Sequence, residues 1–114
     1  MSSDAQRQTR SDLRKEFEQR LSGMPQVRLD TWKDTDLVCI FFREKEFAHF
    51  HGDNILDLRL SPKIIREEGL SRSVSARIHP NRSQNSRWIG VEFHNQSDVE
   101  KLLHLVSRAC DDMT

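Results

Sequence analysis

The segment of residues 46–60 constrains the fold of this chain more than any other, because two alternating runs of residues flank a tight turn. Apolar and polar side chains alternate over residues 47–51 and again over residues 55–60. Between them, residues 52–54 have the Gly-Asp-Asn composition of a turn. The pattern predicts two antiparallel strands joined by a three-residue loop.

The register of this hairpin decides which side chains share a face, because a slip of one residue moves every side chain to the opposite face. A three-residue loop places His49 opposite Asp57 and Phe50 opposite Leu56. This register separates apolar from polar side chains, whereas a two-residue loop would mix them. The apolar face then holds Ala48, Phe50, Leu56, Leu58 and Leu60, and the polar face holds Phe47, His49, His51, Asp57 and Arg59.

His49 and His51 form a His-x-His pair, which projects both imidazoles to one side of a strand, about 6–7 Å apart. A metal or an anion can bridge that spacing, and Asp57 can orient His49 through a ring nitrogen. The spacing fixes no third metal ligand. A solvated polar face with an incidental contact between His49 and Asp57 explains the same pattern, so both interpretations stay open.

Composition limits the classes of protein to which the chain can belong. A chain of 114 residues has room for one hydrophobic core but not for two. The 35% hydrophobic and 32% charged fractions predict a disordered polar tail over residues 1–11 and one domain over residues 12–114. Lys plus Arg and Asp plus Glu number 18 each, so we expect no nucleic-acid partner.

The cysteines and the N-terminus bear on localisation. Cys39 and Cys110 lie in apolar segments, which predicts small buried thiols in a reducing compartment rather than a disulfide framework. Residues 1–10 lack the apolar stretch of a signal peptide, and the longest apolar run, residues 37–42, cannot span a membrane. We therefore expect a soluble cytoplasmic protein that does not associate with membranes.

Hydrophobic periodicity and breaker residues predict the remaining elements. Helices are expected at residues 12–23, at residues 62–68 after a Ser cap, and at the C-terminus after a capping box at residues 97–100. Strands are expected at residues 27–32, 37–42, 47–51, 55–60, 74–78 and 88–94. The order α-β-β-β-β-α-β-β-α predicts an α+β fold, an antiparallel sheet of about six strands with its helices packed mainly on one face.

If the apolar faces of the strands meet the helices, their polar side chains share one surface. That surface would hold His49, His51, Asp57, Arg59, Arg77, His79, Trp88, Glu92 and His94. Along residues 63–88 the basic residues outnumber Glu67 and Glu68, so the rim of this surface is basic. Those basic residues are Lys63, Arg66, Arg72, Arg77, Arg82 and Arg87.

The chemistry of these side chains suits an anion. Arginine binds carboxylate or phosphate bidentately, histidine adds a switchable donor, and Trp88 can stack on a ring. The predicted partner is a small anionic ligand or an acidic segment of another protein. The predicted ligand-binding residues are His49, His51, Asp57, Arg77, His79 and Trp88. Polar side chains that merely cover an exposed antiparallel sheet remain the alternative.

Other functional classes stay open. The sequence has no Gly-rich phosphate loop and no nucleophile elbow, so it does not decide whether the chain is an enzyme, and it points to no particular cofactor. A metal-assisted hydrolase or isomerase would use His49, His51 and His79 as metal ligands and Asp57 as their orienter. A further hypothesis is an interaction module that forms a homodimer.

The motifs strung along residues 41–110 resemble a known family. The run EFAHFHGDNILDLRL, the later Ile-His-Pro at residues 78–80, and a Trp before a final helix that opens with Asp-Val-Glu resemble small domains labelled luciferase family, or luciferase domain. The matching residues are Glu46, His49, His51, Gly52, Asp57, His79, Pro80 and Trp88. The loop at residues 81–87 departs from the glycine-containing turn expected there.

The family resemblance implies the histidine surface and leaves its purpose open. The label does not imply flavin-dependent luciferase chemistry of the bacterial type. That enzyme is a TIM barrel, a fold of typically about 250 residues. This chain has neither that length nor the required alternation of strands and helices.

Overall fold

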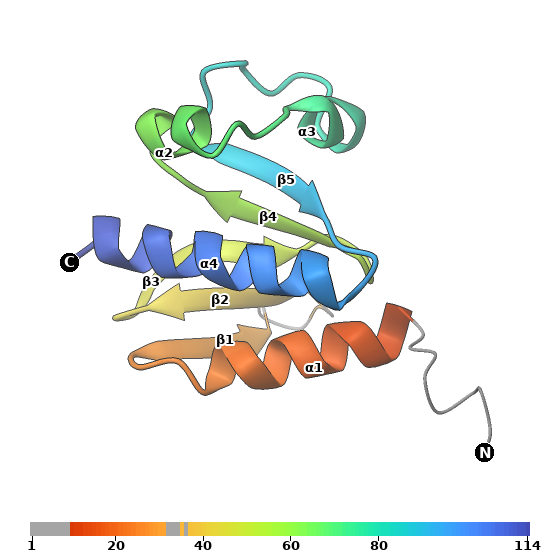
Figure 1. Ribbon diagram of the computed structural model, residues 1–114, viewed down its shortest axis with the longest axis vertical. Helices are drawn as coiled ribbons and strands as arrows, with labels where there is room; N and C mark the ends of the chain where they lie inside the picture. Colours follow the sequence, from red (N-terminus) through yellow and green to blue (C-terminus); the bar gives the residue numbers. More distant parts are fainter. Residues whose placement is uncertain (1–9, 32–34, 36) are drawn as a thin grey trace.

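The computed structural model of the protein describes residues 10–31, 35 and 37–114. Within this part, five strands form one antiparallel sheet in which each strand pairs with the next along the chain (Figure 1). The strands are β1 (Val27–Thr31), β2 (Val38–Phe42), β3 (Lys45–Phe50), β4 (Ile55–Arg59) and β5 (Trp88–Glu92). The helices are α1 (Arg10–Ser22), α2 (Pro62–Glu67), α3 (Ser73–Ile78) and α4 (Gln96–Asp112). The predicted α+β class is confirmed.

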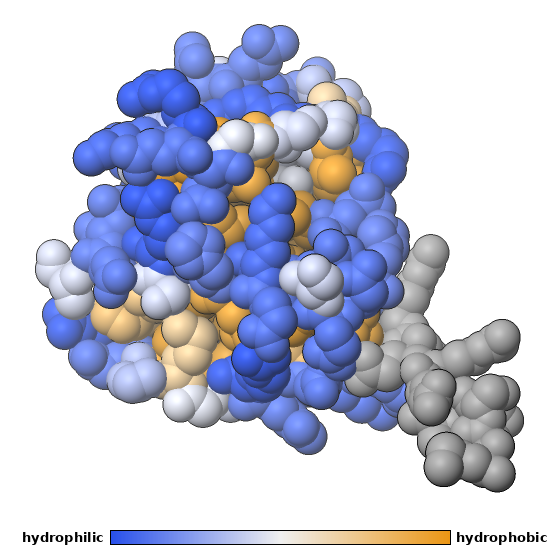
Figure 2. Space-filling model, viewed as in Figure 1, coloured by the Kyte–Doolittle hydropathy of each residue, from blue (hydrophilic) through white to orange (hydrophobic). Residues whose placement is uncertain are grey.

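Helices α1 and α4 cover one face of the sheet, and the core lies between them and the sheet (Figure 1). Leu13, Phe17 and Leu21 recur at helical spacing on α1 and are all buried. The Phe17 ring packs edge-to-face against Phe50 of β3 and against Phe93, with centroids 5.6 and 5.2 Å away. Figure 2 shows a mainly hydrophilic outer surface on this side, so the polar stripes of both helices face outward.

The central hairpin has the predicted register, with His49 opposite Asp57 and Phe50 opposite Leu56. Gly52, in the turn between the strands, has a φ of 75°, a left-handed conformation that glycine adopts without steric cost. The three-residue loop therefore closes as the turn composition indicated, and the side chains sort onto two faces as predicted at every position but one.

That exception is Phe47, whose predicted place on the polar face is wrong. Ile40 of β2 faces Ala48, but the next residue, Phe41, faces Glu46, so Phe47 has no partner on β2. Such a β-bulge breaks the alternation of side chains along a strand. Phe47 joins the hydrophobic core, with 0% of its surface exposed.

The strand predicted at residues 74–78 is wrong as well, because this segment is the helix α3. The pattern fits the period of a strand and also that of a helix, because Val74 and Ile78 are four residues apart and share one face in either structure. Both pack over Gly90 of β5, where an added Cβ atom would come within 3.2 Å of each. The Gly90 N–H donates to the buried Ser75 Oγ (2.7 Å). Helix α3 thus protects the outer edge of β5, and the described sheet has five strands rather than about six.

The two predicted helix caps have different outcomes. Ser61 caps α2 as predicted, because its hydroxyl accepts from the N–H of Ile64 (3.2 Å). The capping box predicted at residues 97–100 is wrong, because Asn95 caps α4 and its side-chain oxygen accepts from the N–H of Asp98 (2.9 Å). Asn and Ser are both favourable caps, and the sequence contains both within three positions.

Other predictions concern the ends of the chain and the cysteines. The polar tail was predicted at residues 1–11. Residues 1–9 lie outside the described residues, and α1 begins at Arg10. Trp32, predicted at the end of a strand, also lies outside the described residues. Cys39 and Cys110 are buried free thiols, and burial raises the pKa of each to about 11. Among the helices described, none has both the length and the apolar character that crossing a membrane requires.

Candidate functional site

Asp57 lies on the sheet face that α1 and α4 leave open, and its side chain is fully buried there. Strand pairing places it on β4 between His49 of β3 and Gly90 of β5. Arg82, from the loop after α3, binds both carboxylate oxygens, because Nη1 donates to Oδ1 (2.7 Å) and Nη2 to Oδ2 (2.8 Å). His49 Nε2 lies 3.2 Å from Oδ2. We call His49, Asp57, His79 and Arg82 the Asp57 cluster.

The Asp57 carboxyl is ionised despite its burial. Burial favours the protonated acid, but the contacts with His49 and Arg82 outweigh it and hold the pKa of Asp57 well below its usual range. Asp57 is therefore a fixed anion at neutral pH and not a proton donor. Its role in the cluster is to hold the Arg82 guanidinium and the His49 ring in place.

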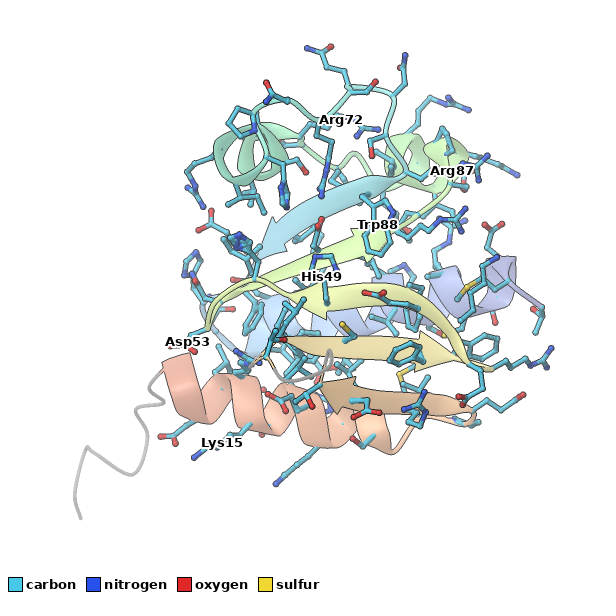
Figure 3. All side chains as sticks on the ribbon, turned by 180° about the vertical axis from the view of Figure 1, so that it is seen from behind. Lys15, His49, Asp53, Arg72, Arg87 and Trp88 are labelled. Carbon is cyan, nitrogen blue, oxygen red and sulfur yellow. The ribbon has the colours of Figure 1, made fainter. Side chains whose placement is uncertain are left out.

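His49 contacts residues from three directions. Its ring packs against that of Trp88 on β5, with centroids 5.3 Å apart, and Figure 3 shows both residues on the open sheet face. On the other side of the ring, Nδ1 lies 3.5 Å from a carboxylate oxygen of Glu46. This nitrogen is buried, yet it forms no hydrogen bond within the described part of the chain. The His49, Asp57 and Trp88 side chains are thus brought together.

His79 follows α3 and brings a second imidazole to the cluster. Its Nε2 lies 3.6 Å from Asp57 Oδ2 and has no hydrogen-bond partner among the residues described. The ring meets that of His51 edge-on, with centroids 5.6 Å apart. Burial, and next the charge of Arg82, lower the pKa of His79 below its ordinary 6.5, so the ring is mostly neutral at pH 7.

The other candidate side chains of the predicted surface lie elsewhere. Arg77 is exposed and pairs with Glu92 at 3.2 Å instead of joining the cluster. His94 lies 3.5 Å from the same Glu92. The remaining histidine, His104, was not placed on that surface, and it contacts Glu68 at 3.0 Å from the exposed side of α4. Three of the five histidines, at positions 49, 51 and 79, therefore form one group.

A cavity of about 380 Å³ opens between α3 and the loop that follows it. Its walls carry Arg72, Ser73, Ser75, Ala76, Arg82, Ser83 and Gln84, and we call it the arginine cavity. Arg72 Nη1 is buried without a hydrogen-bond partner in the described chain. Arg82 donates one hydrogen from each Nη to Asp57. The other N–H donors of its guanidinium remain for other partners.

Arg72 and Arg82 were not among the ligand-binding residues predicted from sequence. The excess of arginine along residues 63–88 placed both on a basic rim, and this was the available signal. The pairing of Arg82 with Asp57 comes from the irregular loop at residues 79–87, where no periodicity indicates the direction of a side chain.

The predicted metal site has no support in this arrangement. The described residues contain no group of three or more His, Cys, Asp and Glu side chains that could hold a metal ion. His49 and His79 both place Nε2 near Asp57, and His51 is exposed beside them. Metal binding through His49, His51 and His79 stays a prediction, as do the enzyme and homodimer hypotheses.

Comparison with known proteins finds a family for most of the folded chain. A family model described as "Luciferase domain" matches residues 44–109, which include β3, β4, β5 and the Asp57 cluster. The match confirms the resemblance that the sequence motifs indicated. Neither the comparison with curated proteins nor that with solved structures finds a match.

Proposed function

The chain belongs to the luciferase domain family, and we propose that it binds a small anion in the arginine cavity. The observation that carries this proposal is that Arg72 and Arg82 line one cavity, and that Nη1 of Arg72 is buried without a partner in the described chain. A buried donor without a partner costs free energy. A shift of the Arg72 side chain toward an oxyanion in the cavity would give Nη1 that partner.

The lining of the arginine cavity suits an oxyanion. Arginine forms short, charge-assisted hydrogen bonds with phosphate, sulfate or carboxylate groups, and serine hydroxyls add neutral donors. The three serines come from both walls, with Ser73 and Ser75 on α3 and Ser83 on the opposite loop. A cavity of this size accommodates a small molecule rather than an extended acidic segment of a partner.

The acidic residues near this end of the molecule neutralise only one of the two arginines of the cavity. Asp57 is bound to Arg82 from the sheet side and balances its charge. Glu67 and Glu68 of the α2 region accept from Arg108 of α4. Arg72 forms no ion pair with any residue that the structure describes. Its charge is therefore available to a ligand.

Isothermal titration calorimetry with inorganic phosphate tests the proposal, using wild-type protein without an affinity tag and the Arg72→Gln variant. Loss of one charge-assisted contact is expected to weaken phosphate binding about tenfold or more. The matched control is Arg77→Gln, which removes a guanidinium from the same short helix but outside the cavity. Its affinity for phosphate should equal that of the wild type.

Two results would contradict the proposal. Wild-type protein that binds no phosphate would exclude a phosphate site in this cavity. An equal loss of affinity in Arg72→Gln and Arg77→Gln would show that phosphate responds to the general charge of this end of the molecule rather than to the cavity.

A further inference from the structure

A second cavity adjoins the arginine cavity and has different walls. Its volume is about 460 Å³, and it lies between α2 and the segment that leads to α3. Three of the side chains that line it are apolar, Pro62, Ile65 and Leu70, and the others include Arg66, Arg72 and Asn85. We call it the apolar cavity. Gly69, which has a φ of 63°, follows the end of α2 and turns the chain along the wall of this cavity.

Arg72 lines both cavities, and the loop at residues 82–85 borders both. Arg82, Ser83 and Gln84 face the arginine cavity, whereas Asn85, the next residue, faces the apolar cavity. Arg72 is therefore a wall common to the two cavities. Each one alone falls in the range of about 300–1,000 Å³ that is usual for small-molecule sites.

Both cavities combine polar groups with apolar surface. The arginine cavity holds two arginines and three serines, although carbon atoms form most of its surface, whereas the apolar cavity is the one lined by the large aliphatic side chains of Ile65 and Leu70. No Asp or Glu of the described chain lines either one. Figure 2 shows apolar surface among hydrophilic side chains at this end of the molecule, near α3. A ligand that fills both cavities needs an acidic group joined to an apolar body.

We propose, building on the proposed function, that the ligand is an amphipathic anion. Its acidic group lies in the arginine cavity between Arg72 and Arg82, and its apolar chain extends past Arg72 into the cavity lined by Ile65 and Leu70. The aliphatic part of the Arg72 side chain packs along the apolar chain while its guanidinium contacts the acidic group.

Calorimetric titration with inorganic phosphate, ethyl phosphate, butyl phosphate and octyl phosphate, each below its micelle concentration, tests this assignment. Each buried methylene is expected to raise the affinity about fourfold until the cavity is filled. Inorganic phosphate should therefore bind more weakly than butyl phosphate, and butyl phosphate more weakly than octyl phosphate.

Two exposed loop residues provide a reciprocal pair of variants. Asn85→Trp fills the mouth of the apolar cavity, so it should leave phosphate affinity unchanged and abolish the gain with chain length. Gln84→Trp fills the arginine cavity and should weaken phosphate and every alkyl phosphate alike. Circular dichroism shows whether each variant keeps the fold. If a variant does not fold, the series of alkyl phosphates on the wild type still tests the inference.

The outcomes separate this inference from the proposed function. Phosphate binding with no gain from ethyl to octyl phosphate would overturn the amphipathic ligand and leave the anion site standing. A gain that persists in Asn85→Trp would also overturn it, because the chain would then lie elsewhere. Failure of wild-type protein to bind phosphate would refute the anion site itself.

Discussion

Asp57 shows how one residue connects the sheet to the proposed anion site. Its charge is fully used within the protein, by two hydrogen bonds from Arg82 and by the nearby His49 nitrogen. A carboxylate in this position attracts no further cation and repels an approaching anion only weakly. Its effect on a ligand is indirect, because it fixes the plane of the Arg82 guanidinium against one wall of the cavity.

Replacement of Asp57 by Asn should destabilise the fold by on the order of 3–5 kcal/mol, because it leaves the largely buried Arg82 charge without an anion. The matched control is Asp53→Asn in the turn of the same hairpin, where the carboxylate is exposed and lies 3.7 Å from an Arg14 nitrogen. That change should cost about 0–1 kcal/mol. Urea denaturation at pH 7 measures both changes, and an equal cost would show that the buried carboxylate contributes no more than the exposed one.

The same pair predicts how stability depends on pH. The folded pKa of Asp57 lies below its unfolded value of about 3.9, so its stabilisation is complete above about pH 5. It is lost as the pH falls through the unfolded value toward the folded pKa. The free energies of unfolding of the wild type and Asp57→Asn should therefore converge below about pH 4.

Residue-scale predictions succeeded where strand periodicity decided the direction of a side chain. His49 faces Asp57 because the hairpin allows one register that separates apolar from polar side chains. Phe47 failed because a bulge depends on the neighbouring strand, which the hairpin pattern does not contain. Arg82 was missed as a partner of Asp57 because it lies 25 positions further along the chain, in an irregular loop.

At the scale of elements, the helix α3 shows why a short pattern can mislead. Five residues from Val74 to Ile78 fit a strand and a helix equally well, and packing decides between them. Gly90 leaves room on β5 for two side chains spaced by one helical turn, and the Ser75 hydroxyl accepts from the Gly90 N–H on that edge strand. The helix also provides Arg72 at its start and His79 at its end, next to the candidate site.

The start of α4 provides a direct test of an element boundary. Asn95→Ala should cost about 1 kcal/mol of stability, because the N–H of Asp98 loses its acceptor. Ser97→Ala should change stability by less than about 0.5 kcal/mol, because Ser97 lies exposed inside the helix. Urea denaturation of the two variants measures both losses of stability. A larger loss in Ser97→Ala than in Asn95→Ala would support the capping box predicted from sequence.

At the scale of the whole molecule, the folded unit is larger than the part that the family model matches. Residues 44–109 leave out α1, β1 and β2, yet these elements complete the sheet and cover the core. The sequence predicted this packing correctly, because the spacing of Leu13, Phe17 and Leu21 indicates a helix that covers a sheet. The position of the helix on the sheet could not be predicted, since periodicity identifies the buried face but not its partners.

Phe17 tests whether α1 belongs to the same cooperative unit as the matched region. Its ring lies between Phe50 and Phe93 with 0% of its surface exposed, so Phe17→Ala should cost about 3–5 kcal/mol. The control Phe41→Ala makes the same change on the open face at a partly exposed ring and should cost less. Unfolding followed by far-ultraviolet circular dichroism and by tryptophan fluorescence should coincide in both variants. If instead α1 detaches first, helix signal will fall at lower urea than fluorescence in Phe17→Ala, and the sheet will be shown to fold without its N-terminal helix.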